Sequence, residues 1–160
     1  MGNPSAPIIV GVYPGQDQRV LEQAARLAEQ MGAALICVWV DPTRYTVDRL
    51  ADGTVVSSPI DPDSTGHSAQ VMPPELFGRF ETLLNSYNIS WEVRARAGNA
   101  SFELGLLADD LDARLIVLGS RERSLRTSLH ELLNGSVAVR LAQKQLRPIL
   151  IVPSTRTSNT

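Results

Sequence analysis

Two glycine-serine pairs in the last third of the chain have the composition of an anion-binding loop. Gly119-Ser120 ends the apolar run that begins at Leu115, and Gly135-Ser136-Val137 opens a segment of helical periodicity. Glycine lets a backbone turn expose its N–H groups, and a helix start adds unpaired donors and the positive end of the helix dipole. This pattern is typical of a phosphate-binding loop in an α/β domain.

Basic side chains lie between the two pairs. Arg121, Arg123 and Arg126 carry guanidinium groups that can bind phosphate through two parallel hydrogen bonds. A solvated basic loop is the alternative interpretation. Ser136 likewise either binds an anion with its hydroxyl and N–H or caps the helix beside Asn134.

The sequence does not show the residue patterns of several other common binding and catalytic sites. The first predicted strand is followed by Tyr13-Pro14-Gly15-Gln16, which is not a dinucleotide fingerprint, and the sequence has no Walker motif. Asp17 and Asp41 do not complete a carboxylate set for Mg²⁺. His67 and His130 lack an evident acid partner, and no nucleophile elbow is present. We therefore expect ligand binding without demanding chemistry rather than an enzyme.

Length and composition limit the class of protein. The 160 residues suit one domain, and 43% apolar with 20% charged residues is ordinary for a globular chain. A net charge of −2 argues against nucleic acid as a partner. The single cysteine, Cys37, cannot form an intrachain disulfide and is predicted to pack inside a strand. Without a basic leader or a long apolar run, we expect a cytoplasmic protein that does not bind membranes.

Apolar runs alternate with segments of helical period, which indicates βαβ units and a parallel sheet. The expected fold class is α/β: a single doubly wound five-stranded parallel sheet of order 3-2-1-4-5, with helices on both faces. The third strand alternates with polar residues, which suits a sheet edge. The predicted strands are residues 7–12, 34–40, 89–97, 114–118 and 148–152, and the predicted helices run from Asp17 to Gly32 and over 73–87, 100–111 and 136–146.

Ligands of such sheets bind at the carboxyl edge, where the strand order reverses. Here that point lies between the first and fourth strands, so the residues that follow the first, second and fourth strands are the candidates for the site. They include Pro14, Gly15, Gln16, Trp39, Gly119 and Ser120.

Residues 41–72 are too polar and too interrupted by proline and glycine to predict a regular element. Loops of this length are usually functional or disordered. A mobile lid and a variable insertion without a role both remain open, with a short hairpin around residues 54–57 also possible. The tail, residues 154–160, is expected to be disordered.

Taken together, several of these motifs resemble the universal stress protein family. The resemblance covers roughly Ala6 to Pro153, so residues 1–153 are assigned to one domain of this type. It rests on the two glycine-serine pairs together with Ile8-Ile9-Val10-Gly11-Val12, Gly98-Asn99-Ala100, Leu115-Ile116-Val117-Leu118 and Arg147-Pro148-Ile149-Leu150-Ile151-Val152-Pro153.

The resemblance implies a homodimer formed through the last strand, from Pro148 to Val152. In one branch of the family it also implies binding of ATP, with or without Mg²⁺, through a G-x2-G-x9-G-[S/T] loop. In this chain Glu122 stands where the middle glycine belongs, and the outer glycines are three residues farther apart. Gln16 replaces the aspartate that ATP-binding relatives often place near the ribose. Trp39 replaces a small apolar residue of the adenine pocket, where it could stack on a base or fill the space itself.

Two functions remain open. The first is a dimeric stress-response module that binds ATP or another adenine nucleotide at the carboxyl edge, through the residues above and Arg121, Arg123, Gly135, Ser136 and Val137, with little or no turnover. The second is a nucleotide-free interaction scaffold, in which Trp39 and the altered loop close the cleft. Both predict dimerisation, because a short apolar edge strand is prone to association unless it is covered.

Overall fold

Five parallel strands form the centre of the molecule. The computed structural model describes residues 6–64, 66–120 and 137–154, and within these the strands follow the order β6-β2-β1-β7-β8. All four neighbouring pairs are parallel, which confirms the predicted order 3-2-1-4-5. The strands are β1 (Ile8–Val12), β2 (Leu35–Asp41), β6 (Trp91–Ala97), β7 (Leu115–Gly119) and β8 (Ile149–Val152).

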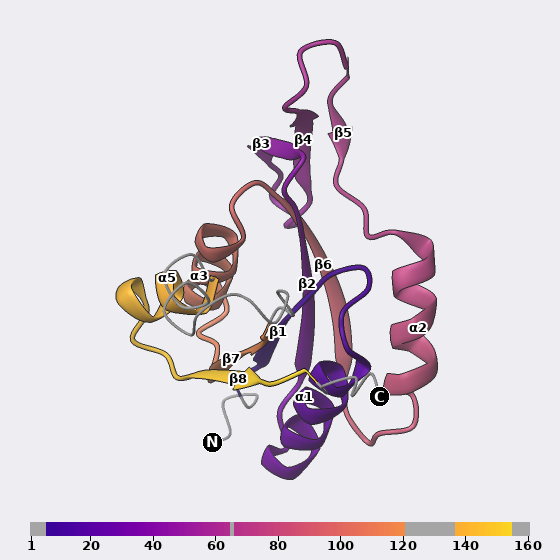
Figure 1. The fold of residues 1–160 in the computed structure, drawn as a ribbon, viewed down its shortest axis with the longest axis vertical. Coiled ribbons are helices and arrows are strands. Elements are labelled where there is room, and N and C mark those ends of the chain that lie inside the picture. Colours follow the sequence, from indigo (N-terminus) through magenta and orange to yellow (C-terminus); the bar gives the residue numbers. More distant parts are fainter. Residues whose placement is uncertain (1–5, 65, 121–136, 155–160) are drawn as a thin grey trace, which may run out of the picture.

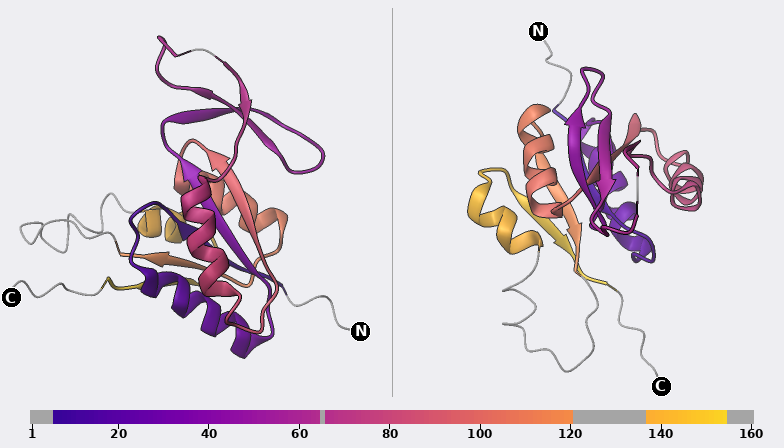
Figure 2. Two further views of the ribbon diagram at one scale, coloured as in Figure 1. Left: turned by 90° about the vertical axis from the view of Figure 1, so that its right-hand side faces the viewer. Right: turned by 90° about the horizontal axis from the view of Figure 1, so that it is seen from above.

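Helices cover both faces of this sheet (Figure 2). On one face α1 (Gln18–Met31) and α2 (Pro74–Leu84) bury a core that includes Ile8, Val10, Leu35 and Cys37. On the other face α3 (Ala100–Asp110) and α5 (Val137–Lys144) bury a second core around Ile9, Ile36 and Ile116. Successive side chains of a strand point to opposite faces, so each apolar run supplies both cores.

Polar side chains and a glycine define the ends of the helices α1 and α3. The Asp17 carboxylate accepts a hydrogen bond from the Arg19 N–H at 2.9 Å and caps α1. Gly32 ends α1 in the left-handed conformation at φ 60°, which glycine adopts without a steric penalty. The Asn99 side chain accepts from the Phe102 N–H and caps α3.

Segment 41–72 differs from the expectation of an irregular loop. It forms a second, antiparallel sheet of β3 (Arg44–Arg49), β4 (Val55–Pro59) and β5 (Ser68–Ala69). We call this segment the inserted sheet. Figure 1 shows it projecting beyond the carboxyl end of β2. Its strands contain polar and charged residues that weaken the apolar alternation on which strand prediction depends.

No helix in the described ranges is both long and apolar enough to cross a membrane.

Candidate functional site

The strands β1 and β7 separate before they reach the carboxyl edge of the sheet. Their pairing runs only from Ile8 with Leu115 to Val10 with Val117. On its other side β1 continues to pair with β2 as far as Val12 with Trp39. The order of connections reverses at this point, so the separation between β1 and β7 is where a doubly wound sheet accepts a ligand.

The turn after β1 places Gln16 over this separation. Gly15 adopts a φ of 79°, and the Gln16 N–H donates to the Tyr13 carbonyl at 3.2 Å. The Gln16 side chain folds back and donates from Nε2 to the Gly11 carbonyl at 3.1 Å. One hydrogen bond donor of this carboxamide is therefore already used by the chain. Pro14 and Gly15 are exposed at the rim.

Gly119 brings the end of β7 against the same turn. A Cβ at this position would lie 2.8 Å from Val20 Cγ2 and 3.2 Å from Gln16 Nε2. The missing side chain thus lets β7 pack closely on α1 and beside Gln16. Gly119 has a packing role whether or not a phosphate approaches it, which the motif alone does not reveal.

Ser120 is held by the segment that follows β8. Its N–H donates to the Val152 carbonyl at 2.9 Å, and its Oγ accepts from the Ser154 N–H at 3.0 Å. The Ser120 N–H, which could otherwise bind a phosphate, is therefore engaged within the fold.

Two further predicted residues flank the site. Trp39 is half-buried at the end of β2 and packs against the core under α1 and α2. Val137, the first residue of α5, packs against the core on the opposite face. Arg121, Arg123, Gly135 and Ser136 lie outside the described residues, as does Arg126, so their roles stay predictions.

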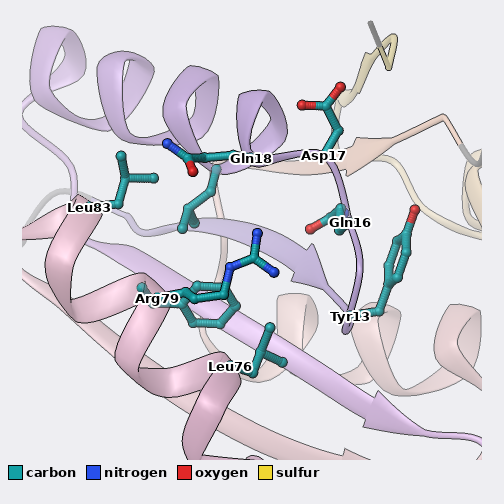
Figure 3. A pocket seen from close by; sticks show the side chains of 9 residues that line it. Tyr13, Gln16, Asp17, Gln18, Leu76, Arg79 and Leu83 are labelled. Carbon is teal, nitrogen blue, oxygen red and sulfur yellow. The ribbon is translucent and has the colours of Figure 1, made fainter. Parts of the chain in front are cut away.

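A small hollow of about 30 Å³ lies between the turn after β1, the start of α1 and the middle of α2. Apolar side chains of the two helices form part of its wall, and Tyr13, Gln16 and Arg79 contribute polar groups. Figure 3 shows the guanidinium of Arg79 reaching across the hollow toward Gln16. Sequence reasoning missed Arg79, because an arginine on an amphipathic surface helix gives no signal of its own.

The described residues contain no group of three or more histidine, cysteine, aspartate or glutamate side chains placed to hold a metal ion. Cys37 is buried, and burial raises the pKa of its thiol to about 12, so it stays protonated and unreactive at neutral pH. The predicted packing role of Cys37 is confirmed.

The fold defines a doubly wound α/β protein whose strand order reverses between β1 and β7. The sequence matches the universal stress protein family over residues 5–153, so the chain belongs to this family. A comparison with curated proteins finds no match.

Solved structures of universal stress proteins share the fold. One, described as a universal stress protein in complex with cAMP, superposes with a TM-score of 0.63 at 19% identity, covering 96% of this chain and 100% of that chain. A protein from Archaeoglobus fulgidus in complex with dAMP gives 0.59 at 20% identity, covering 92% and 98%. One from Burkholderia pseudomallei gives 0.55 at 18% identity, covering 96% and 100%.

Proposed function

We propose that this protein binds ATP or another adenine nucleotide at the carboxyl edge between β1 and β7, and acts in the cytoplasm as a homodimeric stress-response module. The observation that carries the proposal is the convergence of Gln16 and Gly119 at the separation of these two strands. Relatives of the same fold were solved with cAMP and with dAMP, and this supports an adenine nucleotide as the ligand.

In this proposal the site residues contact different parts of the ligand. Because Ser120 already uses its N–H inside the fold, the phosphate is assigned to the start of α5 and to the arginines before it in the sequence. Trp39, which is half-buried near the end of β2, is the residue proposed to stack on the base. With ATP, Mg²⁺ would be carried mainly by the phosphate oxygens, because magnesium usually binds through few carboxylates plus substrate phosphates.

Little or no turnover is expected. Rates of about 1 to 1000 per second require a general base placed within hydrogen-bond reach of the attacking group. Asp17, the nearest carboxylate in the turn after β1, already accepts the Arg19 N–H as the cap of α1. Binding, rather than hydrolysis, would then be the signal that the protein transmits.

The edge strand β8 supports the homodimer. It pairs with β7 on one side, and Leu150 and Ile151 are 41% and 45% exposed. Pairing of residues 148–152 with their copy would cover this apolar edge. Light scattering should give a dimer for the parent and a monomer for Ile151→Lys. Val71→Lys, which changes a 71% exposed residue of the inserted sheet, is the matched control and should stay dimeric.

A nucleotide-free scaffold is the second candidate. The observation that favours it is the engagement of Gln16 with the Gly11 carbonyl and of Ser120 with Val152 and Ser154. These bonds occupy groups that a ligand would otherwise use. In that case the cleft is filled by the chain itself and the dimer surface carries the function.

Calorimetric titration with Mg-ATP, AMP and cAMP decides between the two, after mass spectrometry has checked for nucleotide that copurifies. Nucleotide binding predicts a dissociation constant around 1 μM, or about −8 kcal/mol. A variant with Arg121→Ala and Ser136→Ala should bind at least tenfold more weakly, whereas Arg26→Ala, an exposed arginine on α1, should bind like the parent. No heat up to roughly 1 mM, together with no copurifying nucleotide, favours the scaffold.

A further inference from the structure

We propose that the hollow between α1 and α2 is a subsite for an anionic group carried by the ribose of the bound nucleotide, with Arg79 as the residue that recognises it. This inference rests on the proposed function and adds a specificity to it. The hollow adjoins the turn that carries Gln16, on the face of the sheet covered by α1 and α2 (Figure 3).

Arg79 is available for a ligand. Among the described residues it has neither an ion pair nor a hydrogen bond, although Glu75 lies one helical turn earlier on α2. A glutamate four residues before a basic residue is a common helical ion pair. Here the guanidinium instead extends over the hollow toward Gln16 (Figure 3).

The other polar groups around Arg79 do not neutralise it. Gln16 carries a neutral carboxamide, and Gln18 donates to Glu22 at 2.8 Å. The carboxylate of Asp17 accepts from the Arg19 N–H and points away from Arg79 (Figure 3). The start of α1 adds partial positive charge. The electrostatic balance of the hollow therefore favours an anion.

The size of the hollow fits one functional group. A volume of about 30 Å³ is that of a few non-hydrogen atoms, far less than a nucleotide. The buried side chains of Leu21, Leu76 and Phe80 form its apolar wall. An apolar wall lowers the local dielectric constant and strengthens the attraction between a guanidinium and an anion.

The position of the hollow in the fold indicates that the ribose is the part of the nucleotide that lies next to Arg79. The helix α5, at whose start the 5′-phosphate is proposed to bind, covers the face of the sheet opposite to α1 and α2. A ligand that spans the strand ends therefore brings its ribose, not its 5′-phosphate, to the side of Arg79. A phosphate ester on the 2′ or 3′ oxygen then reaches the guanidinium, whereas an unsubstituted hydroxyl leaves it without a charged partner.

The experiment compares 5′-AMP with adenosine 3′,5′-bisphosphate and adenosine 2′,5′-bisphosphate by calorimetry. The parent protein should bind at least one of the bisphosphates roughly tenfold more tightly than 5′-AMP, the gain from one charge-assisted hydrogen bond. Arg79→Gln should remove this preference and leave the affinity for 5′-AMP within about twofold. Arg26→Gln is the control for the loss of one positive charge and should keep the preference.

Each outcome separates this inference from the function on which it rests. If 5′-AMP binds but neither bisphosphate is preferred, or the preference survives Arg79→Gln, the subsite is wrong while nucleotide binding stands. If none of the three nucleotides nor Mg-ATP binds, both proposals are overturned. The thermal stability of Arg79→Gln should be close to that of the parent. This control shows that a loss of the bisphosphate preference is not caused by unfolding of the variant.

Discussion

The five-stranded sheet and the inserted sheet are held together by different forces. Ile8, Ile9, Leu35 and Ile116 are completely buried between helices. In the inserted sheet, by contrast, the buried residues include Ser57, whose Oγ donates to Gln70 Oε1 at 2.6 Å and accepts from Arg44 Nε at 2.7 Å. The main sheet thus rests on apolar burial, and the inserted sheet depends on directional polar contacts.

The attachment of the inserted sheet to the domain is also polar. Arg49 Nη2 forms an ion pair of 2.6 Å with Glu103 Oε1 on α3, and Thr46 Oγ1 donates to the Ala97 carbonyl at 3.1 Å. Polar contacts fix geometry but contribute little net free energy unless they are broken on one side. We therefore expect the free energy of local opening of the inserted sheet to be lower than the free energy of global unfolding of the domain.

The largest effect on the free energy of unfolding is expected from a substitution in the main sheet. Ile9→Ala removes a fully buried side chain from the central strand β1 and should lower the free energy of unfolding by about 3 kcal/mol, through lost burial and a cavity. Urea unfolding followed by circular dichroism measures it. Val47→Ala, at a residue 46% exposed on β3, should cost less than about 0.5 kcal/mol. Equal losses would contradict the comparison.

Thiol labelling separates the two regions directly. The buried Cys37 thiol, whose pKa burial raises to about 12, should react with an alkylating reagent only after global unfolding. Val55→Cys in a Cys37→Ala background places a thiol at a position 1% exposed in the inserted sheet. It should react on the order of 100-fold faster, which corresponds to an opening free energy about 2.7 kcal/mol lower. Matching rates would show that both sheets open together.

We expect the ion pair between Arg49 and Glu103 to stabilise the inserted sheet. Arg49→Met leaves the carboxylate of Glu103, a residue 3% exposed, without its partner. We expect the Val55→Cys labelling rate to rise about 30-fold, from roughly 2 kcal/mol of lost opening free energy. Adding Glu103→Gln removes the unpaired charge and should restore part of the lost opening free energy, which would slow the labelling again. If the double variant is as labile as Arg49→Met, the pair is not the cause.

The smallest effect is expected at the surface of β6. The ion pair between Arg94 Nη2 and Glu92 Oε1 is 2.7 Å long, with the two side chains 32% and 47% exposed. Solvent screens such pairs, so Glu92→Gln should change the free energy of unfolding by less than about 0.5 kcal/mol. The same urea titration tests it, and a loss above 1 kcal/mol would show that this edge contributes more than its exposure implies.

The sequence allowed the fold to be predicted where local signals agree. The apolar runs, the first helix bounded by Asp17 and Gly32, and the half-polar third strand each favoured the same topology, and the structure confirms them. At the proposed site, the sequence pointed to the ends of β1 and β7, where the structure places Gln16 beside Gly119. It could not reveal that Val20 leaves no room for a side chain at position 119, or that the Ser120 N–H donates to the Val152 carbonyl. In both cases the partner is distant along the chain.

The sequence by itself determined the family, the five strands and the edge at which they end, because buried parallel strands appear as continuous apolar runs and their order follows from right-handed connections. Only the tertiary structure decided that residues 41–72 form a sheet and that Arg79 faces a hollow. Arg49 pairs with Glu103, which lies 54 residues later in the chain. Thr46 donates a hydrogen bond to the carbonyl of Ala97, which lies 51 residues later. Such contacts leave no local periodicity, because the partners are distant along the chain and meet only in the folded structure.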